Sequence, residues 1–448
     1  MSRYTSATDA DRRAMLATIG AGSVDELFAE IPASVRLDRP LDLPAGMAEQ
    51  DVAGHLAELA ARNVDCDAET SFLGAGMYDH YVPALIDSIL QRSEFLTPYT
   101  PYQPEISQGG LQVMFEYQTA ISELTGLAVS NASVYEGPSA VAAAAYLAKL
   151  ETRRTGLVVS RGVHPHSRET LATHAVGYGM TVSEAGLDAV GATDVDALAG
   201  LVGDDTAAVF VQQPNFLGTV EELGAIGEAA KRTGALFVVA ADPIPLGILE
   251  PPGALGADIC VGEGQTLGNR LDFGGPSFGF FAAAERFIRK LPGRIAGETR
   301  DVDGRRGFVL TLQTREQHIR REKATHNICT AQALNALAGT IYLSWLGRRG
   351  LVELGELLLR RTHYARETLG LEAINPGPVV REFAVRVPDL DAAVQRARAA
   401  GINPGYRLGR DYPELGDGLL VALTERRTRA DIDRLAAVLG GVREEAPA

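Results

Sequence analysis

Three polar residues follow short apolar runs that we predict to be β-strands. Asp242 ends "FVVAAD", Gln265 follows "ADICVG", and His164 follows "TGLVVS". Ligands of open parallel sheets bind beyond the carboxyl ends of the strands, so we expect these three side chains to lie around one pocket. An acid, a nucleophilic side chain and an aromatic ring at three such positions could together bind an aromatic cofactor and use it in catalysis. A glutamine amide, however, cannot form a Schiff base.

This spacing is typical of enzymes that use pyridoxal phosphate. In them the acid keeps the pyridinium nitrogen protonated, and a lysine after the next strand binds the cofactor. The loop "NASVYEGPSAVAAAA" also enters a helix whose first amides could bind phosphate, but Glu136 stands there and could satisfy those amides itself. His164 and Asp242 equally fit ordinary loop and turn positions.

Lysine is rare in this chain, which has only Lys149, Lys231, Lys290 and Lys323. None falls at the position of Gln265, so we expect no catalytic lysine on this chain. We therefore predict a cofactor fold whose pocket, formed by His164, Asp242 and Gln265, is vestigial.

The surrounding elements favour a two-domain α/β protein behind an N-terminal arm. Short apolar strands alternate with helices from 137 to 285, which predicts a mostly parallel sheet covered on both faces. Apolar residues from Leu111 to Leu124 share one helical face, and Gly126 is the expected stop. We predict a helical arm over 1–70, with a Pro-punctuated stretch at 36–44 lying on a partner or on the body. A large domain over 71–345 and a smaller α+β domain over 346–448 follow.

Composition restricts the function classes. The net charge of −15 argues against a nucleic-acid surface, and 46% hydrophobic residues in 448 provide for a sizeable core. Cys66, Cys260 and Cys329 are far apart, which disfavours disulfides and a metal site. We find no basic-then-apolar leader and no apolar run of membrane-spanning length, so we expect a cytoplasmic protein without membrane contacts.

Two further stretches present polar side chains that are suited to contact with a substrate or a partner. The proline-rich "FLTPYTPYQPEISQGGLQ" (95–112) predicts a rigid loop that displays Tyr99, Tyr102, Gln103 and Glu105. The second stretch is a cationic run suited to anion contact, formed by Arg315, His318, Arg320, Arg321 and Lys323. Both allow a structural interpretation: a buried interface loop, and a helix face paired with Glu316 and Glu322.

Long motifs make the sequence recognisable. "FLGAGMYDHYVP" (72–83), the 95–112 stretch, "EPPGALGADI", "PGRIAGETRD", "LQTREQHIRREKATHNICTAQAL" and the "GEGQTLG…FGGP" turn resemble the P-protein of the glycine cleavage system. That family is glycine dehydrogenase (decarboxylating, aminomethyl-transferring). The resemblance extends over nearly the whole chain, whose length is similar to that of the separate α form, subunit 1.

The resemblance implies a fold type I, aspartate aminotransferase-like transferase fold. It implies that pyridoxal phosphate and its lysine belong to a β chain, subunit 2, and that this chain alone is inactive. Together the chains would decarboxylate glycine, release CO2 and pass the aminomethyl group to the lipoyl arm of the H-protein. The residues expected to border that active site or the subunit interface are Tyr99, Thr100, Tyr102, Gln103, Glu105, Arg315, His318 and Arg321.

Two alternatives stay open at this point. The chain could be a stand-alone pyridoxal-phosphate enzyme of the aminotransferase or desulfurase kind, which Gln265 opposes. It could also be a non-catalytic scaffold for a partner. The sequence does not decide whether the assembly is α2β2.

Overall fold

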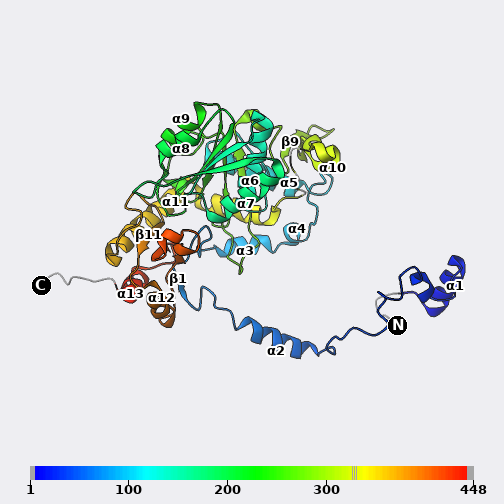
Figure 1. The fold of residues 1–448 in the computed structure, drawn as a ribbon. Coiled ribbons are helices and arrows are strands. Elements are labelled where there is room, and N and C mark those ends of the chain that lie inside the picture. The colour runs from blue at the N-terminus through cyan, green and yellow to red at the C-terminus, as the bar shows by residue number, and fades with distance from the viewer. Residues whose placement is uncertain (1–5, 325, 327, 329, 441–448) are drawn as a thin grey trace. The chain divides into compact units, whose positions relative to one another are not determined.

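The computed structural model describes residues 6–324, 326, 328 and 330–440, and the chain divides after Val64 into two units. The first unit consists of two helices joined by extended chain (Figure 1). Its elements are Asp9–Ile19 (α1), the 3₁₀ helix Asp25–Phe28 (η1) and Glu49–Ala60 (α2). None of residues 6–64 is buried, so this unit has no hydrophobic core of its own.

A seven-stranded sheet organises the second unit, in the order β2-β8-β7-β6-β5-β3-β4. The strands from β7 to β4 pair in parallel, and β8 and β2 continue the sheet in the antiparallel sense. The strands are Val129–Ser130 (β2), Gly156–Ser160 (β3), Thr181–Ala185 (β4), Thr206–Gln213 (β5), Leu236–Ala241 (β6), Ile259–Glu263 (β7) and Gly279–Ala283 (β8).

Helices cover both faces of this sheet because both faces of its central strands are apolar (Figure 1). In β6, Val238 and Ala240 pack toward α6 and α7, whereas Phe237 and Val239 pack toward α8 and α9. The helices are Ala84–Leu90 (α3), Ser93–Leu96 (α4), Gln108–Thr125 (α5), Gly137–Thr152 (α6), Pro165–Tyr178 (α7), Val195–Leu201 (α8), Leu223–Lys231 (α9), Gln317–Arg320 (α10) and Ala333–Leu369 (α11).

A smaller three-stranded antiparallel sheet, in the order β11-β14-β13, lies at the C-terminal end of the second unit. Its core also includes α12, α13 and the last part of α11, which is kinked at Gly347. A short pair, β1 with β12, and a hairpin, β9 with β10, complete the fold. The bounds are Thr70–Ser71 (β1), Ala296–Arg300 (β9), Arg306–Leu310 (β10), Glu382–Arg386 (β11), Leu390–Ala399 (α12), Ile402–Asn403 (β12), Tyr406–Arg407 (β13), Gly418–Ala422 (β14) and Arg429–Leu439 (α13).

The predicted parallel sheet is confirmed, and α5 ends at Gly126, which has a left-handed φ of 68°. His164, Asp242 and Gln265 follow the carboxyl ends of β3, β6 and β7 as expected. The proposed domain boundary at 345 falls inside α11, so the smaller domain begins within a helix that both parts share. Among the described residues, no helix is long and apolar enough to cross a membrane.

Gly218 is required for the close approach of the loop after β5 to the backbone of β11. Its φ is +94°, and an added Cβ would lie 2.1 Å from the carbonyl oxygen of Glu382. We expect Gly218→Ala to lower the free energy of unfolding by about 1–3 kcal/mol or more, through both strain and overpacking. Urea-induced unfolding measures this loss.

Gly224 in α9 is the matched control, because an added Cβ there meets no atom within 4 Å. Gly224→Ala should stabilise the chain by about 0.5–1 kcal/mol through helix propensity. Equal stabilities of the two variants would contradict the tight packing of Gly218 against β11.

Candidate functional site

Asp242 is paired with an arginine of this chain. The Asp242 Oδ2 atom lies 2.5 Å from Nη2 of Arg381, which directly precedes β11, and Arg381 is almost fully buried. The guanidinium carbon of Arg381 in turn lies 3.4 Å from the ring centroid of Tyr78. Burial raises the pKa of Asp242, and Arg381 opposes that rise. The acid that could hold a pyridinium nitrogen therefore already holds a guanidinium.

Gln265 holds the backbone of Tyr78 in place through hydrogen bonds. The Tyr78 N–H donates to Gln265 Oε1 at 2.8 Å, and Gln265 Nε2 donates to the carbonyl oxygens of Tyr78 at 3.1 Å and Asn269 at 2.9 Å. The side chain is 1% exposed. Its amide nitrogen and its amide oxygen are thus both used to fix the chain around Tyr78, at the position where a cofactor enzyme would carry its lysine.

Two carboxylates occupy the first turn of α6, where a cofactor phosphate would need free amides. Glu136 accepts from the Ser139 N–H at 2.9 Å, and Glu263 accepts from the Gly137 N–H at 2.9 Å. Glu263 also accepts from the Gln265 N–H at 3.0 Å, and burial raises its pKa to about 7. A dianionic phosphate would meet these acids at the amides it requires.

His164 is engaged on both ring nitrogens. Its Nδ1 accepts from the His166 N–H at 3.1 Å, so its Nε2 is the donor to the Ala75 carbonyl at 2.8 Å. Burial lowers its pKa to about 4, and its ring meets Phe216 edge to face at 4.9 Å. Together, these four positions do not fit pyridoxal phosphate, because side chains of this chain fill the places of its lysine, nitrogen partner, phosphate and stacking ring.

The segment around Ala75 and Tyr78 is also tied to β11. The Tyr78 hydroxyl donates to the carboxylate of Glu382, and the Ala75 N–H donates to the other oxygen at 2.7 Å. Burial raises the pKa of Glu382 to about 7. Polar contacts thus join the 75–78 segment and the end of β6 to the start of β11.

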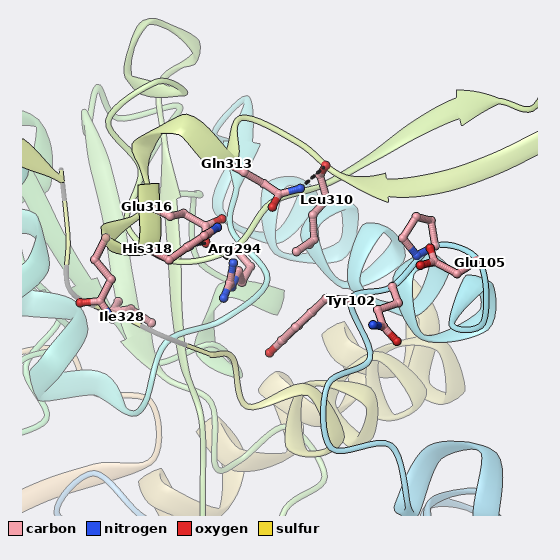
Figure 2. Close-up of a pocket in the computed structure, with 11 residues that line it drawn as sticks. Tyr102, Glu105, Arg294, Leu310, Gln313, Glu316, His318 and Ile328 are labelled. Atoms are coloured by element: carbon pink, nitrogen blue, oxygen red, sulfur yellow. Dashed lines mark hydrogen bonds and ion pairs between the residues drawn. The ribbon is translucent and has the colours of Figure 1, made fainter. Parts of the chain in front are cut away.

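A second site is open to solvent. A pocket of about 340 Å³ lies between the proline-rich loop and the segment around α10 (Figure 2). Its lining residues come from both segments and from the hairpin region: Tyr102, Gln103, Pro104, Glu105, Arg294, Leu310, Gln313, Glu316, Gln317, His318 and Ile328. Figure 2 shows Arg294, Glu316 and His318 gathered on one wall while Tyr102 extends from the loop.

Charges of both signs meet on that wall. Glu316 is paired with Arg294, and its Oε2 also lies 3.4 Å from Nδ1 of His318. Its Oε1 is buried without a hydrogen-bond partner. The guanidinium of Arg294 lies 5.0 Å from the ring centroid of Tyr102. The charges on this wall are therefore largely engaged with one another, and His318 is the most exposed of the three side chains.

Gln108 holds the proline-rich loop in place. Its Nε2 donates to the Pro104 carbonyl at 2.6 Å and to the Phe308 carbonyl at 2.9 Å, while its Oε1 accepts from the Phe308 N–H. The Tyr102 hydroxyl accepts from the Ala331 N–H at 3.1 Å. The loop is therefore fixed against both the hairpin and the start of α11.

Seven of the eight residues that were expected to border an active site divide into three groups. Tyr102, Gln103, Glu105 and His318 share the 340 Å³ pocket, whereas Tyr99 is 94% exposed and lines an adjacent pocket of about 330 Å³. Thr100 and Arg321 are exposed and line neither pocket.

Arg315 differs from the exposed cation that its neighbours suggested. It is buried, and its guanidinium donates to the carbonyl oxygens of Leu291, Gly293 and Leu312. Burial lowers its pKa to about 10. Its role in this structure is to hold the loop before β9 against the segment before α10.

The sequence analysis overlooked two sets of residues. Arg294 forms the charged wall of the open pocket together with Glu316, and Tyr78, Arg381 and Glu382 pack around Asp242 and Gln265. Arg294 and Tyr78 lie in stretches that carried the family resemblance, but no local pattern singled them out. Glu316 was considered only as a pairing partner of the cationic run. Among the described residues, no group of three or more His, Cys, Asp or Glu side chains could hold a metal ion.

Comparisons of the sequence agree with this architecture. The family model of the glycine cleavage system P-protein matches residues 2–439. The probable glycine dehydrogenase (decarboxylating) subunit 1 of Carboxydothermus hydrogenoformans is 52% identical over 98% of this chain and 100% of that protein. The protein of the same name from Brevibacillus brevis is 49% identical over 98% of this chain and 99% of its own length.

Solved structures extend the comparison. A glycine decarboxylase (P-protein) of the glycine cleavage system, in inhibitor-bound form, superposes with a TM-score of 0.87 at 44% identity, over 98% of this chain and 99% of that one. A sphingosine-1-phosphate lyase from Burkholderia pseudomallei gives 0.64 at 15% identity, covering 92% of this chain and 94% of that one. The latter likeness shows that this chain and that lyase share a fold.

Glu382 makes the stability of the chain depend on pH. Its folded pKa of about 7 exceeds the value of about 4.3 for an exposed glutamate, so the group binds its proton more tightly in the folded state. Its contribution to stability is full below about pH 4 and is lost as the pH rises through about 7, by on the order of 3 kcal/mol.

We expect Glu382→Gln, which keeps the shape and stays neutral, to flatten the fall in unfolding free energy between about pH 5 and about pH 8. Urea unfolding at the two pH values measures it. Glu372→Gln, at an exposed glutamate of the same domain, is the control and should leave the wild-type slope unchanged. A Glu382→Gln slope equal to that of the wild type would contradict the buried, proton-binding carboxyl.

Proposed function

Because the chain belongs to the glycine cleavage system P-protein family, we propose that it is subunit 1, the α subunit, of glycine dehydrogenase (decarboxylating), an enzyme that it completes together with a second subunit. The observation that carries this function is the full-length match to proteins named subunit 1. A name with a numbered subunit implies a partner subunit. Because side chains of this chain fill its own pocket, that partner is the subunit that would bind the cofactor.

The partner in this proposal, subunit 2 or β, binds pyridoxal phosphate. The support comes from this chain: Gln265, Arg381, Glu263 and His164 are committed to internal contacts where a cofactor would bind. Pyridoxal phosphate supplies an electron sink for the decarboxylation of glycine. CO2 leaves, and the aminomethyl group passes to the lipoyl arm of the H-protein, whose disulfide is the acceptor.

This chain contributes the wall of the active site that the cofactor-bearing subunit lacks. The proline-rich loop displays Tyr99 almost fully exposed, and it is held rigidly by Gln108. Rigid loops at the mouth of a site exclude water and orient a small substrate. In the adjoining pocket, Arg294 is paired with Glu316 and His318 lies beside the same carboxylate, so polar side chains border this mouth.

A stand-alone pyridoxal-phosphate enzyme is the weaker alternative, because the cofactor does not fit the vestigial pocket. A purely non-catalytic scaffold is compatible with that filled pocket. The scaffold differs from our proposal only in whether the 97–105 loop reaches the reacting groups, and the second experiment below separates these two.

Reconstitution tests the proposal as a whole. We expect this chain, mixed with pyridoxal phosphate and reduced with borohydride, to retain no cofactor, whereas the complex with subunit 2 retains it on the partner. Exchange of labelled CO2 with the carboxyl of glycine should require both chains and the H-protein. A reducible cofactor band on this chain alone, or full exchange by the partner alone, would overturn the assignment.

Loop variants test the contribution to the active site. We expect Tyr99→Ala and Glu105→Ala to lower kcat for glycine–CO2 exchange by about tenfold or more, because misplacement of a substrate by 1 Å can cost a hundredfold. Co-elution with subunit 2 in size-exclusion chromatography should be unchanged. Ile106→Ala, at a 76% exposed residue of the same loop outside both pockets, is the control. Wild-type kinetics for both test variants would rule out a contribution of the loop to the active site and would favour the scaffold role.

A further inference from the structure

The N-terminal unit exposes far more apolar surface than its size accounts for. The first 64 of the 448 residues carry fifteen of the thirty exposed large hydrophobic side chains found among the described residues. They are Met15, Ile19, Val24, Leu27, Phe28, Ile31, Val35, Leu37, Leu41, Leu43, Met47, Val52, Leu56, Leu59 and Val64. At roughly half exposure, these fifteen side chains offer on the order of 1,000 Å² of apolar surface, against about 800 Å² buried by each partner in a standard interface.

Helix α2 concentrates this surface on one face. Val52, Leu56 and Leu59 follow the i, i+4, i+7 spacing and are 39%, 57% and 38% exposed. An amphipathic helix with such anchors is suited to a hydrophobic groove. An isolated helix of twelve residues is marginal in water, so α2 needs a surface to pack on.

Charge distinguishes between the surfaces that could cover it. Residues 1–64 hold ten carboxylates and six arginines, a net charge of −4, and the rest of the chain carries the remaining −11. Both the body of this chain and a second copy of it are therefore acidic, which disfavours them as the surface that an acidic arm docks on. A different chain with a basic rim around an apolar groove is electrostatically complementary.

The N-terminal unit is also part of what the relatives share. The family model matches from residue 2, and the subunit 1 proteins align over 98% of this chain. The unit is thus a regular part of subunit 1 rather than an extension particular to this sequence.

We propose that residues 6–64 are a docking arm for subunit 2, in which the apolar face of α2 (Val52, Leu56, Leu59) enters a groove of that subunit. The inference rests on the proposed function, since that function supplies the second chain. The arm then binds the two subunits together independently of the 97–105 loop, which has its own role at the active site.

The test compares Leu56→Asp with Ala57→Asp in the full chain. Both variants add the same charge at adjacent positions of α2, but only Leu56 lies on the apolar face. We expect Leu56→Asp to raise the Kd for subunit 2 by about tenfold or more and Ala57→Asp to leave it near the wild-type value. Hydrogen exchange of 49–60 should be fast in the isolated wild-type chain and slow in the complex.

Other results would overturn the inference. Equal affinities of the two variants would remove α2 from the interface. Slow exchange of 49–60 in the isolated monomer would place the arm on its own body, and a concentration-dependent homodimer broken by Leu56→Asp would place it on a second copy. The proposed function fails separately, if the wild-type chain neither binds subunit 2 nor supports glycine–CO2 exchange.

Discussion

The buried guanidinium of Arg381 imposes the constraint on which the pocket region depends. A charge without a partner in a dry interior costs several kcal/mol, so Arg381 must keep both its ion pair with Asp242 and its position over the ring of Tyr78. Tyr78 is in turn fixed by Gln265 through its backbone and by Glu382 through its hydroxyl. The end of β6, the turn after β7, the 73–80 segment and the start of β11 are thereby joined at one point.

The same physical rule applies to the polar groups around Arg381, most of which are paired, although Nε of Arg381 itself has no hydrogen-bond partner. Buried N–H groups and charges must find partners, and leaving one unsatisfied costs more than a typical hydrogen bond contributes. Here Glu263 and Glu136 satisfy the first turn of α6, Gln265 stands in the place of a lysine, and Arg381 stands opposite the acid.

Much of this fold could be predicted from the sequence, because strand and helix periodicities in 137–285 report which faces are buried, and glycines such as Gly126 mark the ends of helices. The place of Gln265 at a strand end could also be predicted, because it follows a recognisable strand. Arg381 was not, because "REFAVRVP" indicates a strand but does not show that its first residue points inward. Arg315 was misleading for the same reason: a run of cations does not reveal which one bonds to three carbonyls in the interior.

Because the interior of this chain is filled by its own side chains, its functional contacts are expected at its surface. Exposed aromatic and aliphatic side chains are concentrated in a few places on that surface. A tyrosine that is 94% exposed on a loop braced by prolines and by Gln108 gains nothing from burial within this chain. The same holds for the apolar face of α2. Rigid exposed aromatic and aliphatic groups lower the entropic cost of binding, because little more freedom is lost when a partner covers them. The 97–105 loop and the apolar face of α2 are therefore the parts of this chain that are best suited to contact with another molecule.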